Sequence, residues 1–167
     1  DYIVVDEVQD FTNIQLHIIL KSLNNPTNFI LCGDSNQVVY PNFFSWSHLK
    51  SMFYRSDLIE NEVKILRANY RNSQTITTLA NRLLKIKNAR FGSIDKESNY
   101  LLTTDTAVKG DAVFIEQVGN AVADLGQKTR QSVKYAVLVL RNEDKAKARE
   151  WFKTPLLFSV QELKGLE

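Results

Sequence analysis

Short apolar runs recur along this chain, and each has the length of a β-strand. The six runs lie at residues 2–5, 29–32, 63–66, 112–115, 135–140 and 156–160. Runs of four to six mostly apolar residues are typical of strands that are buried on both faces, as in parallel sheets. The pattern therefore predicts six short strands.

Helical spacing of apolar residues separates most of these runs. A first helix is expected after a cap at Thr12 or Asn13, with apolar residues three and four positions apart: Leu16, Ile19, Leu20 and Leu23. A second stripe follows Ser73, and residues 119–131 and 143–151 predict two further helices, whereas residues 41–62 and 91–110 are mixed or irregular. Strands that alternate with helices predict an α/β fold with parallel strands.

Composition narrows the class of protein. The 167 residues are 44% hydrophobic and include only six Gly and three Pro, which excludes collagen-like and disordered chains. The single cysteine, Cys32, excludes a disulfide framework and a cysteine-rich zinc module. No apolar run reaches the roughly 18 residues that span a bilayer, and no signal peptide opens the chain, so we expect a cytoplasmic protein without a membrane partner. The chain begins at Asp1 directly before an apolar run and ends at residues 164–167 (KGLE) without a closing segment. We therefore expect this chain to be part of a longer protein.

Charge is distributed unevenly. Residues 1–66 carry four Lys and Arg against eight Asp and Glu, whereas residues 67–167 carry seventeen against eleven. A basic half suits a polyanionic partner such as nucleic acid. Lysine-rich, solvated helix faces produce the same imbalance, so charge alone leaves both interpretations open.

Two acids follow the first apolar run. Asp6 and Glu7 lie where a parallel sheet presents its ligand-binding edge, at the carboxyl end of a strand. A carboxylate there suits Mg²⁺, and a second acid one residue later suits a general base for an attacking water. Asp10 is then expected to cap the next helix.

Four blocks of residues follow one another along nearly the whole chain. They are residues 6–10 (DEVQD), 33–40 (GDSNQVVY), 66–73 (LRANYRNS) and 159–167 (SVQELKGLE). In this order they resemble motifs II, III, IV and V of superfamily 1 helicases of the UvrD/Rep/PcrA type, and residues 135–142 (YAVLVLRN) resemble a strand of that family's second RecA-like domain. Four blocks in order are much more specific than any one of them. The resemblance implies RecA-like parallel sheets flanked by helices.

The resemblance implies catalytic roles for the first two blocks. Asp6 matches the acid that coordinates Mg²⁺, and Glu7 matches the base that activates water. Gln37 matches the glutamine that senses the γ-phosphate of ATP and couples it to DNA. Gln9 and Asp10 are expected to support these groups.

The resemblance implies that ATP binds in a cleft, with Asp6, Glu7 and Gln37 on one wall and residues of the later blocks on the other. Tyr70 matches an aromatic that stacks on adenine, and Arg71 matches an arginine finger, a planar cation suited to charge on phosphoryl oxygens. Gly165 and Glu167 match positions near the nucleotide, with the glutamate contacting the ribose.

Contacts to DNA are also implied. Tyr40 carries over directly from motif III, and Ser159 keeps the hydroxyl that motif V offers to a DNA phosphate. Phe44 and Trp46 are candidates for base stacking, although core packing is an equal alternative for Trp46 and the favoured one for Phe43.

The chain departs from the family in three places. No GxxxxGK[ST] occurs, so the phosphate-binding loop of motif I is absent from these residues. Gln161 stands where motif V has histidine. Residues 73–158 leave no room for the family's large 2B subdomain, so we expect a compact, divergent member or a chain with an omitted segment.

Taken together, the motifs predict a part of an ATP-dependent helicase or translocase that moves on single-stranded or 3′-tailed DNA, with 3′→5′ polarity implied by the family alone. Residues 1–69 would form the end of the first RecA-like domain (1A), and residues 70–167 the start of the second (2A). Two alternatives remain: an ATPase switch that does not unwind, and a non-catalytic nucleic-acid-binding module. The retention of Glu7, Gln37 and Arg71 argues against the second, because plain binding needs none of them.

Overall fold

The computed structural model describes residues 1–39, 42–54, 63–93, 95, 98–116 and 120–164. The contacts within the chain divide it into two units, Asp1–Ala112 and Val113–Glu167. This division differs from the boundary near residue 70 that the motifs imply, and the assignment to 1A and 2A stays a prediction.

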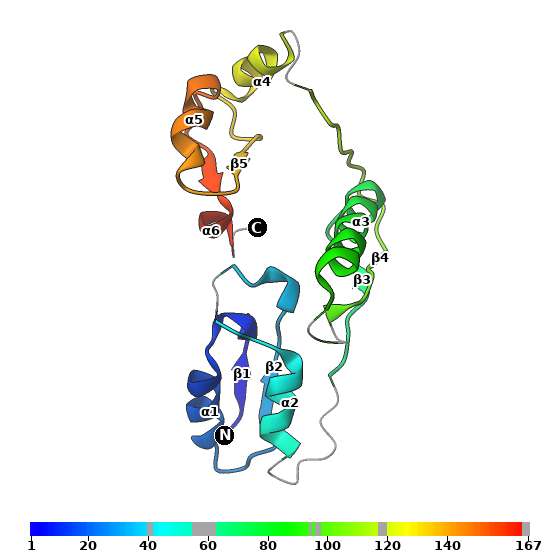
Figure 1. Cartoon of the computed structure of the whole chain (residues 1–167), viewed down its shortest axis with the longest axis vertical. Helices are drawn as coiled ribbons and strands as arrows, with labels where there is room; N and C mark the ends of the chain where they lie inside the picture. The colour runs from blue at the N-terminus through cyan, green and yellow to red at the C-terminus, as the bar shows by residue number, and fades with distance from the viewer. Residues whose placement is uncertain (40–41, 55–62, 94, 96–97, 117–119, 165–167) are drawn as a thin grey trace. The chain divides into compact units, whose positions relative to one another are not determined.

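The first unit begins with a pair of parallel strands. Strand β1 (Ile3–Val5) pairs with β2 (Phe29–Leu31), with Val4 opposite Ile30. A 3₁₀ turn, η1 (Val8–Asp10), leads from β1 into helix α1 (Asn13–Lys21), and η2 (Ser35–Gln37) follows β2. Helix α2 (Trp46–Tyr54) completes this part, and α1 and α2 lie beside the strand pair (Figure 1).

The start of α1 corrects one prediction. The side chain of Thr12 accepts a hydrogen bond from the Gln15 N–H, and Gln15 reaches back to the Thr12 N–H at 2.8 Å. This reciprocal capping box satisfies two backbone donors at the helix start. Asp10 lies in η1 instead, so the expectation that Asp10 caps this helix is wrong.

A small apolar core lies on one side of the strand pair. Its buried residues come from β1, η1, both helices and the segment before α2: Val5, Val8, Leu16, Phe44, Trp46 and Leu49. The opposite face of the pair is open, because Val4 is 67% exposed and Ile30 is 57% exposed. Parallel strands are ordinarily covered on both faces, so this face is unusual.

A long helix dominates the rest of the first unit. Helix α3 (Gln74–Phe91) begins at Ser73, whose hydroxyl accepts the Ile76 N–H at 3.3 Å, and is followed by Gly92 with a φ of 74°. Strand β3 (Ala68–Asn69) precedes the helix and pairs in parallel with β4 (Thr103–Thr104). Both strands lie beside α3 (Figure 1).

The second unit repeats the alternation of strand and helix. Helix α4 (Ala121–Thr129) is followed by β5 (Val137–Val139), α5 (Asp144–Trp151), β6 (Leu157–Ser159) and the short α6 (Val160–Leu163). Strands β5 and β6 are parallel, with Leu138 opposite Phe158. Gly126 permits a close approach here, because a Cβ at this position would lie 2.5 Å from the Trp151 carbonyl oxygen.

Most predicted elements are confirmed, and the strand pairs are parallel as expected. Two strand predictions are wrong: residues 63–66 and 112–115 form neither strand nor helix. A strand requires a partner as well as an apolar run, and the partner is set by tertiary structure. Among the described residues, no helix is long and apolar enough to cross a membrane.

Candidate functional site

The end of β1 presents the two acids to solvent. Asp6 and Glu7 are both exposed, and the Glu7 N–H donates to the Asp6 carboxylate at 2.8 Å. Glu7 has φ 51° and ψ 42°, the left-handed conformation that costs a non-glycine residue about 1–3 kcal/mol. Strain of this kind persists only where the surrounding structure fixes the backbone. Two backbone hydrogen bonds supply that fixation: the Val8 N–H donates to the Cys32 carbonyl at 2.8 Å, and the Glu7 carbonyl accepts the Asp10 N–H at 2.9 Å.

Gln9 holds the Glu7 side chain. It is completely buried, and its side-chain amide donates to the Glu7 carboxylate and accepts the Asp34 N–H at 2.9 Å. Its backbone carbonyl accepts from the Asn42 side chain. One buried amide therefore joins the turn after β1 to the turn after β2, which matches the supporting role expected for Gln9.

Gly33 makes this junction possible. A Cβ on Gly33 would lie 2.4 Å from the Gln9 Oε1 and 2.7 Å from the Val8 Cγ1. Both contacts are shorter than carbon atoms tolerate, and both partners are fully buried. The glycine of the GDSNQ block is thus required by the close approach of the two turns.

Gln37 lies on the η2 turn that follows. The Asp34 carboxylate caps this turn by accepting the Asn36 N–H at 2.8 Å, and it also accepts from the Gln37 side chain at 3.0 Å. The structure therefore brings Asp6, Glu7 and Gln37 into one hydrogen-bonded neighbourhood through Gln9 and Asp34.

This neighbourhood suits a metal-bound phosphate. Mg²⁺ usually takes one or two protein carboxylates and keeps water and phosphate oxygens as its other ligands. Asp6 offers one exposed carboxylate, and one of its oxygens is used by the Glu7 N–H. Among the described residues, no cluster of three or more metal-binding side chains occurs.

Asn69, a residue with no predicted role, fixes the backbone that carries Tyr70 and Arg71. The Asn69 side chain accepts the Arg71 N–H at 3.0 Å and the Asn72 N–H at 2.9 Å, which forms a tight turn between β3 and α3. The Tyr70 ring projects from this turn and is 67% exposed. An asparagine before a helix cap is the sequence signal that predicts such a turn.

The aromatic residues expected to stack on bases are placed differently. Phe44 and Trp46 are buried in the core, with ring centroids 5.2 Å apart in an edge-to-face arrangement. This burial favours core packing, the alternative stated for Trp46, over base stacking for both rings. Phe43, which was expected to pack in the core, is instead 91% exposed with a φ of 56°. Tyr40 lies outside the described residues.

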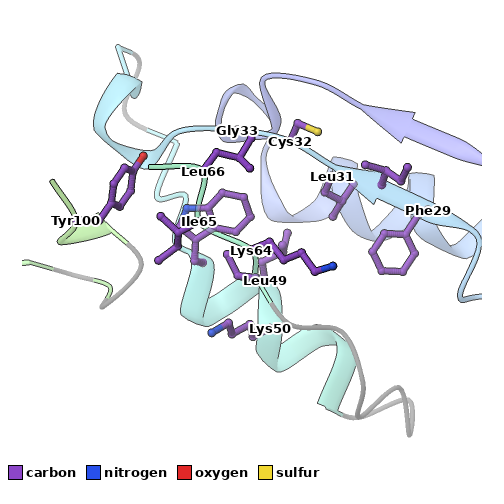
Figure 2. A pocket seen from close by; sticks show the side chains of 13 residues that line it. Phe29, Leu31, Cys32, Gly33, Leu49, Lys50, Lys64, Ile65, Leu66 and Tyr100 are labelled. Carbon is purple, nitrogen blue, oxygen red and sulfur yellow. The ribbon is translucent and has the colours of Figure 1, made fainter. Parts of the chain in front are cut away.

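Trp46 also lines a cavity of about 560 Å³ in the first unit. Figure 2 shows the cavity between β2, α2, the extended residues 64–66 and Tyr100. Its lining is mostly apolar and contains none of Asp6, Glu7 and Gln37. The cavity is therefore separate from the acidic neighbourhood.

Ser159 is held by its own helix in the second unit. It is buried, its N–H donates to the Glu162 carboxylate at 2.9 Å, and its hydroxyl donates to the same group at 3.2 Å. In this arrangement the Ser159 hydroxyl is used within its own helix start, and its contact with a DNA phosphate stays a prediction. Lys145 of α5 donates to Glu162 at 2.6 Å, and its hydrogen bond is the main reason that the pKa of Glu162 falls to about 2, with the Ser159 N–H second. Gly165 and Glu167 lie outside the described residues.

Comparisons with known proteins support the resemblance to UvrD/Rep helicases. Residues 1–46 match the model of the UvrD/REP helicase N-terminal domain. The chain is 27% identical over 183 residues to the TPR and ankyrin repeat-containing protein 1 of Homo sapiens, which covers 97% of this chain and 6% of that protein.

Two bacterial relatives carry helicase names. The chain is 26% identical over 157 residues to the probable DNA helicase II homolog of Mycoplasma genitalium, with 86% of this chain and 22% of that protein covered. It is 33% identical over 86 residues to the ATP-dependent DNA helicase Rep of Buchnera aphidicola, with 50% and 12% covered. The chain thus spans less than a quarter of the length of each of these relatives.

Proposed function

Because the chain is UvrD/Rep-like in sequence, we propose that the whole protein is an ATP-dependent helicase or translocase that couples ATP hydrolysis to movement along single-stranded DNA. The observation that carries this proposal is the buried Gln9 amide, which joins Glu7 to the turn that presents Gln37. A structural turn needs neither an exposed acid pair nor a glutamine presented beside it.

The acids have complementary tasks in this proposal. Asp6 would hold Mg²⁺ on the nucleotide, which supplies charge neutralisation on the phosphates. Glu7, oriented by Gln9, would accept a proton from the attacking water. Gln37 would register the γ-phosphate, and its bond to Asp34 would pass that change to the η2 turn.

Tyr70 and Arg71 would complete the nucleotide site. The exposed Tyr70 ring has a free face for adenine stacking, and Asn69 fixes the backbone that carries both residues. Arg71 would stabilise charge on the transferred phosphoryl group. Gly165 and Glu167 keep their proposed places near the ribose on the basis of the motif alone.

Phe43 is the better candidate for a base-stacking residue. Its ring is exposed, and the preceding Asn42 is anchored to the Gln9 carbonyl and to the Phe44 N–H at 3.2 Å. An aromatic on a fixed backbone offers a stacking platform worth about 1–3 kcal/mol per base. Its connection to Gln9 would place the DNA contact next to the catalytic acids.

The proposal is tested in the whole protein by replacing the base. Glu7→Gln keeps the hydrogen bond from Gln9 but removes the proton acceptor, so ATP hydrolysis should fall by at least a hundredfold while ATP binding persists. Steady-state turnover and binding of a fluorescent ATP analogue measure the two effects, with Glu150→Gln on α5 as the control. Unchanged turnover in Glu7→Gln would remove Glu7 as the base.

A second experiment tests the DNA side. Phe43→Ala should weaken binding of single-stranded oligonucleotides by about five- to a hundredfold and leave ATP turnover without DNA unchanged. A strand-displacement assay on duplexes with 3′ or 5′ tails measures unwinding and its polarity. Equal oligonucleotide affinity for Phe43→Ala and the unaltered protein would exclude Phe43 as the stacking residue.

An ATPase switch is the second candidate, because the match that covers 97% of the chain is to a protein named for its TPR and ankyrin repeats. Such a switch would hydrolyse ATP without moving on DNA. ATP turnover by the whole protein that is indifferent to single-stranded DNA would favour the switch, whereas strong stimulation would favour the translocase.

A further inference from the structure

The η2 turn that carries Gln37 is tied to distant parts of the first unit. The Ser35 and Ser98 hydroxyl oxygens are 2.5 Å apart. The Asn36 side chain donates to the Ser98 carbonyl at 3.2 Å and accepts from the Lys87 ammonium at 2.5 Å. Both ends of the Asn36 amide are therefore used, one toward α3 and the other toward the segment after it.

Residues 98–105 run back along α3. The Asn88 side chain donates to Asn99 at 2.8 Å, and the Asn81 side chain makes two bonds to the backbone of Leu102, at 2.8 and 3.0 Å. Beyond this point, the Asp105 N–H donates to the Asn69 carbonyl at 3.0 Å. Hydrogen bonds and the short segment between them thus connect Asn36 to the turn that carries Tyr70 and Arg71.

Helix α3 makes the same connection as a rigid element. Its 18 residues span about 27 Å, with Lys87 near one end and the Tyr70–Arg71 turn before the other. Ser73 caps its start. Burial raises the pKa of the Tyr100 phenol, and the charge of Asp34, at the start of η2, raises it further.

We propose that Ser35, Asn36, Lys87 and Ser98 form a polar latch that positions Gln37 relative to Tyr70 and Arg71. The latch joins the turn beside the catalytic acids to both connections that lead to the opposite side of the nucleotide site. Asn36 is its central positioning residue, since it contacts α3 and the following segment at once. This inference rests on the proposed ATPase function and adds a means of coupling the two groups of residues.

The test replaces the latch with a covalent bond in the whole protein. Asn36→Ala should lower kcat for ATP about tenfold with KM little changed, because the altered positioning affects the transition state rather than binding. Ser35→Cys with Ser98→Cys, in a Cys32→Ser background, should form a disulfide, and this disulfide should restore most of the kcat of Asn36→Ala. Reduction should remove the rescue, and Asn24→Ala is the matched surface control.

A readout without activity separates this inference from the proposed function. Amide hydrogen exchange at Arg71 and Asn72 should speed up in Asn36→Ala and slow again once the disulfide forms. If the unaltered protein hydrolyses no ATP, the proposed function fails, and the exchange data still decide the latch. An unchanged kcat in Asn36→Ala, failure of the disulfide to form or to rescue, or exchange that does not respond would each overturn the latch.

Discussion

Single residues decide how the two acids are presented. Glu7 adopts a left-handed backbone, Gln9 is buried behind it, and Gly33 leaves room for the Gln9 amide. The sequence alone predicts that Gly33 and Gln9 belong to motifs. It does not predict that they touch, because the contact joins residues that are far apart in the chain. The sequence left core packing and base stacking equal for Trp46 and favoured core packing for Phe43, whereas Trp46 is buried and Phe43 is exposed. Aromatic residues so close together in the chain do not define which of them faces the core.

Gly33→Ala tests the junction at this scale. The added methyl group would collide with Gln9 and Val8, so we expect a loss of about 1–3 kcal/mol in the free energy of unfolding. Gly92→Ala is the control, because Gly92 has open space around it and costs only the strain of its positive φ, about 1 kcal/mol. Urea unfolding followed by tryptophan fluorescence compares them. Equal losses of unfolding free energy in the two variants would contradict the steric contact of a Gly33 Cβ with Gln9 and Val8.

Helices and strands are predictable from the sequence where the residues that stabilise them lie close together in the chain. Helix α1 begins at Thr12, one of the two predicted caps, and α3 begins directly after Ser73, where the apolar stripe was expected to start. In both helices a side-chain hydroxyl accepts the N–H three residues later, which is a local determinant. Helix α2 was not predicted: the Ser45 hydroxyl at its start accepts the His48 N–H at 3.0 Å, but the carboxylate that accepts the Trp46 and Ser47 N–H groups belongs to Asp95, far along the chain. Strand β3 likewise forms at Ala68–Asn69 because Thr103–Thr104 is available to pair with it.

Asp95 therefore gives a prediction about α2. It is buried, and its carboxylate accepts the N–H groups of Trp46 and Ser47 at 2.9 and 3.0 Å. Asp95→Ala leaves both donors without an acceptor and should cost about 1–2 kcal/mol of unfolding free energy. Asp95→Asn keeps one acceptor oxygen and should cost less. Thermal unfolding of the three proteins measures the order, and equal stability of Asp95→Ala and the unaltered chain would contradict the cap.

Glu162 gives a prediction about pH in the second unit. Because its pKa is lowered to about 2 from an ordinary 4.5, its carboxylate stabilises the fold above about pH 4.5, and this stabilisation is lost as the pH falls toward 2. Glu162→Gln should therefore be less stable than the unaltered chain at pH 7, with the difference vanishing near pH 2. Urea midpoints at pH 7, 4 and 2 measure this. A difference that is independent of pH would show that the ion pair with Lys145 is not responsible.

At the scale of the molecule, the order of the motifs says more about the family of this chain than the predicted strands and helices do. The UvrD/Rep resemblance was clear from four short blocks, and the family model matches residues 1–46, which contain the first two. The parallel strand pairs agree with the expected α/β class. The division of contacts after Ala112 was not foreseen, because it depends on which segments pack together rather than on any local break in the sequence.

The absence of a GxxxxGK[ST] sequence from residues 1–167 gives a prediction at this scale. ATP hydrolysis requires donors for the β- and γ-phosphates, which that loop ordinarily supplies. We expect the 167-residue chain to show no ATP turnover, whereas the proposed function expects the whole protein to hydrolyse ATP. Phosphate release assays on both measure this. Turnover by the purified chain that is abolished by Glu7→Gln would show that other residues replace the loop.

The open face of the first strand pair has a consequence for handling the chain in solution. Val4 and Ile30 stand opposite each other on exposed, paired strands, and Tyr2 beside them is also exposed. Uncovered apolar strands recruit further strands, which is the first step of aggregation. The separately expressed chain should therefore self-associate as its concentration rises, and Val4→Thr with Ile30→Thr should shift that association, measured by light scattering, to higher concentration.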